Sequence, residues 1–154
     1  PGYPTDPSER LREPENEAPS YYPAGTFEWG GYARFMEVHE RWLLRNDTAL
    51  PAEELATMPL VLVTAVHAVK TLGEVGPGSR VLVQAGASGS GSMAIQVAKS
   101  LGASVITTVS TEAKAALACK LGADEVIFYR VRKVAEAVRE WTSNVRESTS
   151  LPRI

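Results

Sequence analysis

A run of small residues from Gly86 to Gly91 has the composition and spacing to bind a phosphate group. Glycines at its two ends allow a ligand to approach the backbone closely, and Ser88 takes the place of the central glycine in the pattern G-x-G-x-x-G. Backbone N–H groups in such a turn donate to phosphate oxygens, and a helix that begins there adds a favourable partial positive charge. The candidate ligand-binding residues in this run are Gly86, Ala87, Ser88, Gly89, Ser90 and Gly91.

The elements on either side make this turn a specific signal. A buried strand is expected directly before it, and a helix with one apolar face directly after it. Strands and helices then alternate, which predicts a parallel sheet and is typical of the Rossmann dinucleotide-binding fold. The alternative is a glycine- and serine-rich connection without a ligand, which leaves the small residues at a tight elbow unexplained. The expected strands are Val81–Ala85, Ser104–Val109 and Glu125–Tyr129, and the expected helices are Ser92–Leu101, Thr111–Leu121 and Val131–Trp141.

The end of the second strand distinguishes the two nicotinamide dinucleotides. Proteins that bind NAD usually carry Asp or Glu there, which accepts a hydrogen bond from the ribose 2′-hydroxyl. This strand instead ends without a carboxylate, at Thr108–Thr111, and Lys114 follows it, while Tyr129 and Arg130 end the third strand. Hydroxyl, ammonium and phenol or guanidinium groups suit a 2′-phosphate, so we predict NADPH. The alternative is that Lys114 and Arg130 are solvated surface charges.

The part of the chain before the turn predicts less regular structure. Residues Pro1–Pro23 are rich in proline and expected to form a loop, because proline lacks a backbone donor. Two short β-like runs follow at Tyr32–Val38 and Trp42–Leu44. A helix should begin at Pro51, be interrupted at Met58-Pro59 and resume over the apolar residues from Leu60 to Leu72.

Composition excludes several classes of function. The 154 residues carry a formal net charge of −2, so no basic field would attract nucleic acid or an anionic membrane. We find no apolar run near the ~20 residues of a membrane span and no signal peptide, so we expect a cytoplasmic protein. Cys119 is the only cysteine and is expected to be buried, while His39 and His67 have no clustered partners. We therefore expect no metal site in this chain.

An ordered series of short motifs carries a family resemblance. The motifs are Gly30–Ala33, Leu50-Pro51, Met58–Leu60, Thr64–Ala68, Val81–Gly89, Ala94–Lys99 and Leu121–Ile127. Their order resembles the medium-chain dehydrogenase/reductase superfamily, and in particular its zinc-independent quinone oxidoreductases and related enoyl reductases. The resemblance runs from about Gly30 to Trp141.

The resemblance implies an architecture and a set of site residues. Residues 1–50 would be the end of a GroES-like, β-rich catalytic domain, 51–142 the first half of a Rossmann NADP-binding domain, and 143–154 an atypical polar tail. By resemblance, Ser110, Lys114 and Tyr129 match positions around the 2′-phosphate, and Thr64 matches a position near the nicotinamide. No catalytic residue is assigned.

The resemblance also implies a function for a longer protein, of which this chain, beginning without Met, is expected to be a part. That protein would be an NADPH-dependent enzyme that transfers hydride to a quinone or to an activated alkene or carbonyl, with a small-molecule substrate, as a homodimer. Two alternatives stay open. One is a zinc-dependent alcohol dehydrogenase of the same superfamily with its ligands outside this chain, and the other is a non-catalytic remnant or interaction fragment.

Overall fold

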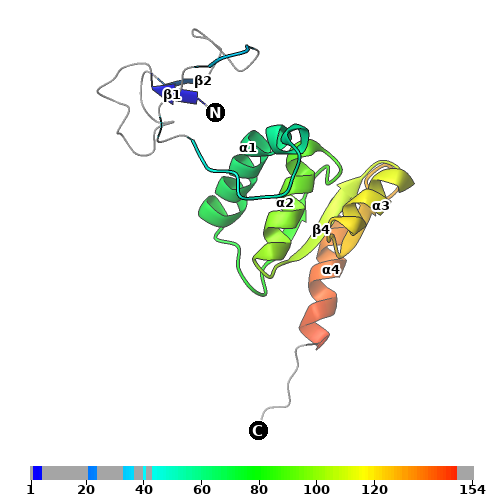
Figure 1. The fold of residues 1–154 in the computed structure, drawn as a ribbon. Coiled ribbons are helices and arrows are strands. Elements are labelled where there is room, and N and C mark those ends of the chain that lie inside the picture. The colour runs from blue at the N-terminus through cyan, green and yellow to red at the C-terminus, as the bar shows by residue number, and fades with distance from the viewer. Residues whose placement is uncertain (1, 5–20, 24–32, 37–39, 41–42, 149–154) are drawn as a thin grey trace. The chain divides into compact units, whose positions relative to one another are not determined.

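The computed structural model describes residues 2–4, 21–23, 33–36, 40 and 43–148 (Figure 1). The chain divides into two compact units, Pro1–Ala56 and Thr57–Ile154. The second unit contains the glycine-rich turn and the elements that surround it.

In the first unit, β1 (Gly2–Pro4) pairs antiparallel with β2 (Tyr21–Pro23), with Gly2 opposite Pro23. The prediction of a loop throughout Pro1–Pro23 was therefore wrong at these residues. Proline is tolerated because both strands of a two-stranded ribbon are edge strands. The β-like runs at 32–38 and 42–44 form no strand at their described residues, 33–36 and 43–44, and their other residues, with most of the expected GroES-like part, lie outside the described ranges.

The second unit is built on a parallel sheet in the order β3 (Arg80–Val83), β4 (Ser104–Val109), β5 (Glu125–Phe128). The three strands form in the apolar runs predicted for them, and the expected Rossmann-type arrangement is confirmed. Because β4 is the central strand, it is buried on both faces, and all its residues from Val105 to Val109 are shielded from solvent.

Helices cover both faces of this sheet (Figure 1). Alternate residues of β4 point to opposite sides. Val105 and Val109 join a core with α2 (Gly89–Ser100) and α3 (Glu112–Lys120), whereas Ile106 packs with α4 (Val134–Ser148). Helix α4 begins later than predicted, because the N–H groups of Val131 and Arg132 first donate to the carbonyl of Phe128 and form a turn. At its other end, α4 extends to Ser148, into the expected polar tail.

The helix before the sheet is longer than expected. Helix α1 (Ala52–Val66) continues without a break through Pro59 into a π-helical segment, η4 (His67–Leu72). A proline inside a helix removes one backbone hydrogen bond, but the helix stays continuous at Pro59, and Ala65 and Val69 on its C-terminal side are buried in the core. The predicted interruption at Met58-Pro59 was therefore wrong.

The continuous helix also changes the expectation that no segment approaches the length of a membrane span. The helix has 21 residues, Ala52–Leu72, and an 18-residue stretch of it has a mean hydropathy of 1.6, which satisfies length and composition criteria for crossing a bilayer. One such helix in the described part of the chain is weak evidence for a membrane, since core helices of soluble proteins pass the same test.

A carboxylate ties the start of β4 to helix α2. Asp124 accepts hydrogen bonds from the Lys99 ammonium at 2.8 Å and from the N–H of Val105 at 2.6 Å, and its own N–H donates to the carbonyl of Val105. Burial raises the pKa of Asp124, but the hydrogen bonds from Lys99 and Val105 and the Lys99 charge outweigh it, so the pKa lies below the usual value of 3.8.

This lowered pKa predicts an acid-dependent contribution to stability. The contribution is complete above pH 3.8 and is lost as the pH falls through the lower pKa of the folded state. The destabilisation caused by Asp124→Asn should therefore be clear at about pH 6 and shrink toward pH 2–3 in urea unfolding. Asp47→Asn, at an exposed aspartate, is the control. An Asp124→Asn effect that does not vary with pH would contradict the assignment.

Candidate functional site

The turn between β3 and α2 has a fixed internal structure. Ala85 adopts the left-handed conformation with φ of +52°, and its carbonyl accepts from the N–H of Ser88 at 2.8 Å. Ser88 then caps α2, because its hydroxyl accepts from the N–H of Gly91 at 3.1 Å. Helix α2 consequently begins at Gly89, three residues earlier than predicted from its apolar face.

Two glycines are required by space rather than by backbone angle. A Cβ at Gly86 would overlap the Thr107 hydroxyl and lie 2.9 Å from Cδ1 of Ile95. A Cβ at Gly91 would overlap the carbonyl of Ala85, which is backbone and cannot rotate away. At Gly89, by contrast, the nearest atom to an added Cβ is Cγ1 of Val61 at 3.8 Å, an ordinary contact.

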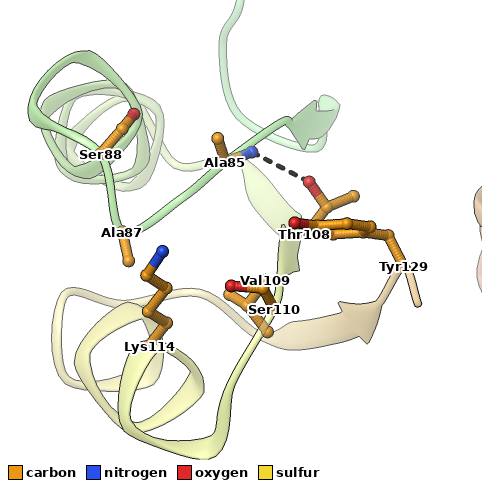
Figure 2. Close-up of a pocket in the computed structure, with 8 residues that line it drawn as sticks. All are labelled: Ala85, Ala87, Ser88, Thr108, Val109, Ser110, Lys114 and Tyr129. Atoms are coloured by element: carbon orange, nitrogen blue, oxygen red, sulfur yellow. Dashed lines mark hydrogen bonds between the residues drawn. The ribbon is translucent and has the colours of Figure 1, made fainter. Parts of the chain in front are cut away.

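Two hydrogen bonds join the turn to strand β4. The carbonyl oxygen of Thr108 accepts from the N–H of Gly86 at 3.2 Å, and its hydroxyl accepts from the N–H of Ala85 at 2.9 Å (Figure 2). Next to it, the buried Thr107 hydroxyl donates to the carbonyl of Val83 at 2.6 Å.

A pocket of about 120 Å³ opens at the carboxyl ends of β3, β4 and β5. It is smaller than the roughly 300–1,000 Å³ of a complete small-molecule site, so it can hold only one part of a dinucleotide. Figure 2 shows the Lys114 side chain extending from α3 toward Ala87, with Ser110 and Tyr129 on the sides of the same hollow. The lining residues are Ala85, Ala87, Ser88, Thr108, Val109, Ser110, Lys114 and Tyr129.

The chemistry of this pocket suits an anion. Lys114 supplies a positive charge, four of the lining side chains carry hydroxyl groups, and none carries a carboxylate. Within the described part of the chain, the N–H groups of Gly89 and Ser90 at the start of α2 have no hydrogen-bond partner. These are donors of the kind that bind phosphate oxygens at helix N-termini.

The structure brings half of the predicted binding residues together. Five line the pocket: Ala87, Ser88, Ser110, Lys114 and Tyr129. Gly86 and Gly91 lie buried beneath the turn, and Gly89 and Ser90 form the exposed first residues of α2. Thr64 does not line the pocket; it is exposed on α1, and its hydroxyl donates to the carbonyl of Leu60 at 2.8 Å. Arg130 is exposed and is also absent from the lining.

Three lining residues were not predicted as binding residues. Val109 entered the sequence analysis only as a position where NAD-binding proteins usually carry Asp or Glu. The sequence does not predict the conformation of Ala85, because alanine rarely adopts a positive φ. Thr108 offered a usable signal, since a threonine pair inside an otherwise apolar buried strand needs hydrogen-bond partners nearby.

The candidate metal ligands are dispersed. Among the residues that the structure describes, no group of three His, Cys, Asp or Glu side chains is close enough to hold an ion. Cys119 is exposed on α3, so the expectation that it is buried was wrong. His67 is exposed on η4, and His39 lies outside the described residues.

Known proteins are similar to this chain over part of its length. The family model described as "Zinc-binding dehydrogenase" matches residues 89–147. A 2-haloacrylate reductase from Burkholderia sp is 43% identical over 97 residues, which cover 63% of this chain and 29% of the relative. The structure of Escherichia coli quinone oxidoreductase complexed with NADPH aligns with a TM-score of 0.59 at 38% identity, covering 62% of this chain and 29% of that one.

The chain belongs to the medium-chain dehydrogenase/reductase superfamily. A further member, an NAD-dependent alcohol dehydrogenase, aligns with a TM-score of 0.83 at 34% identity over 93% of this chain and 42% of its own. The chain thus spans less than half the length of these relatives. Its membership confirms the resemblance seen in the motifs.

Buried Gly91 and exposed Gly89 yield a test of the turn. Gly91→Ala should destabilise the protein by about 2 kcal/mol or more, because the added methyl meets backbone that cannot move cheaply. Gly89→Ala, two residues earlier in the same helix, should change the free energy of unfolding by less than about 0.5 kcal/mol. Urea unfolding of both variants checks this pair. Equal effects at the two positions would show that space beneath the turn does not decide its sequence.

Proposed function

We propose that this chain binds NADPH through the turn and the pocket, as part of an oxidoreductase that transfers hydride to a quinone or to an activated alkene or carbonyl. The observation that carries the proposal is the pocket at the end of β4, where Lys114 stands among hydroxyl groups and no carboxylate lines the wall. A 2′-phosphate gains from that ammonium and those hydroxyls. A free ribose 2′-hydroxyl would lack the carboxylate that it normally meets.

The residues of this chain would bind and orient the cofactor. The pyrophosphate is assigned to the N–H groups that begin α2, where Gly86 and Gly91 allow the backbone to fold closely enough. The 2′-phosphate is assigned to Ser110, Lys114 and Tyr129. The nicotinamide supplies the hydride when bound, and the protein supplies position and electrostatic environment.

The relatives support both parts of this proposal. The quinone oxidoreductase from Escherichia coli was solved with NADPH, and the Burkholderia relative is a reductase of 2-haloacrylate, an alkene activated by its carboxylate. An electron-poor alkene or a quinone is accordingly the proposed class of small-molecule substrate. Independence from zinc, a homodimer and a cytoplasmic location belong to the same proposal and rest on the sequence.

A second candidate has an observation of its own. The likeness to an NAD-dependent alcohol dehydrogenase covers 93% of this chain, more than the likeness to the quinone oxidoreductase does. An alcohol dehydrogenase of the same superfamily whose zinc ligands lie outside this chain is therefore the alternative function. It differs from the first in requiring stoichiometric zinc.

The pocket predicts which dinucleotide is preferred. Lys114→Met should weaken NADPH binding by about 10- to 100-fold, because a charge-assisted hydrogen bond is lost, and should leave NADH binding nearly unchanged. The measurement is fluorescence titration of each reduced dinucleotide. Lys120→Met is the matched control, because Lys120 lies at the far end of α3, is exposed and does not line the pocket.

Three results would contradict the proposal in different ways. Tighter binding of NADH than of NADPH by the unaltered chain would favour the NAD-dependent alternative. Stoichiometric zinc in the purified protein would favour an alcohol dehydrogenase. No saturable binding of either dinucleotide up to about millimolar concentration would favour a non-catalytic remnant.

A further inference from the structure

Thr108 contacts two consecutive residues of the glycine-rich turn through different atoms. Its hydroxyl accepts from the N–H of Ala85 at 2.9 Å, and its backbone carbonyl accepts from the N–H of Gly86 at 3.2 Å. The residue is only 6% exposed and belongs to the central strand of the sheet. The turn is therefore attached, at two adjacent peptide groups, to the buried central strand of the sheet.

Ala85, which donates to the Thr108 hydroxyl, has an unfavourable backbone conformation. Ala85 has φ of +52°, a conformation that an L-residue with a Cβ adopts at a steric cost. Glycine would reach this conformation freely. In this chain the conformation persists in an alanine, and the Thr108 hydroxyl is the side-chain acceptor that satisfies its part-buried N–H.

The hydroxyl groups of Thr107 and Thr108, which are neighbours in β4, have different partners. The Thr107 side chain donates to the carbonyl of Val83, a contact within the sheet. The Thr108 hydroxyl instead reaches out of the sheet to the turn, at a place where it also lines the pocket (Figure 2). Valine would fill the same volume in the strand and would leave the Ala85 N–H without its acceptor.

We propose that Thr108 is a positioning residue that holds Ala85 left-handed and so fixes the start of α2 where its free N–H groups receive the pyrophosphate. The identity of the ligand rests on the function proposed above. The positioning itself is a property of the turn and can be measured without any ligand.

The binding test compares two substitutions of Thr108 in the 154-residue chain. Thr108→Val should weaken NADPH and NADH by a similar factor of about 5 to 30, because the pyrophosphate is common to both dinucleotides. Thr108→Ser keeps the hydroxyl and should restore most of the affinity. This pattern differs from that of Lys114→Met, which should alter the preference between the two dinucleotides.

Ser79→Ala is the matched control. The Ser79 hydroxyl likewise accepts from a part-buried backbone N–H, that of Gly76, at 3.1 Å, but it precedes β3 and lies outside the pocket. It should lower stability to a similar degree and leave dinucleotide affinity unchanged. Equal weakening by Ser79→Ala and Thr108→Val would reduce the role of Thr108 to general stability and overturn the proposal.

Hydrogen exchange gives a second readout that is independent of binding. In Thr108→Val the Ala85 and Gly86 amides should exchange at least about tenfold faster, while amides of α4 keep the rates of the unaltered protein. Failure of the unaltered chain to bind dinucleotides would contradict the proposed function, and this exchange result would still decide the positioning role. Unchanged exchange at Ala85 and Gly86 would overturn it.

Discussion

The structure of the second unit depends on close packing between the segment that follows β3 and the start of α2, where two positions have no room for a Cβ atom. At Gly86 the backbone lies against Thr107 and Ile95, and at Gly91 the helix lies against the carbonyl of Ala85, so neither position admits a Cβ. This close packing places the N-terminus of α2 directly above the carboxyl end of the sheet. The ends of β4 and β5 then supply side chains to the same place, because parallel strands end on one edge. The proposed phosphate site depends on that geometry.

Electrostatics add selectivity to a shape that is set by packing. The free N–H groups of α2 attract any phosphate, whereas Lys114 and the hydroxyls at the end of β4 favour an additional one. At the opposite end of the sheet, Asp124 accepts from both Lys99 and Val105 and so ties the last turn of α2 to the first residues of β4. The helix is thereby fixed at both ends.

The sequence predicted the central elements because their signals are local. Apolar runs bounded by glycine located β3, β4 and β5, and the spacing of small residues located the turn. One failure involved a contact distant in sequence. The support from Thr108 depends on a partner 23 residues away in the sequence, which propensity does not reveal.

The predicted site divides in the same way. Ser110, Lys114 and Tyr129 were predicted from the ends of the second and third strands together with the family resemblance, and all three line one pocket. Thr64, which the resemblance assigns to the nicotinamide end of the cofactor, does not line this pocket, and its role stays a prediction. The left-handed Ala85 gave no compositional signal, since a glycine is the residue expected at such an angle.

The serine cap of α2 has a consequence for how tightly an anion is held. Because the Ser88 hydroxyl accepts from the N–H of Gly91, the first turn of the helix is held by a contact within the chain that needs no ligand. The conformational entropy of that segment is lost during folding and not during association. Such a receptor is preorganised, so more of the attraction between its N–H groups and an anion is expressed as affinity.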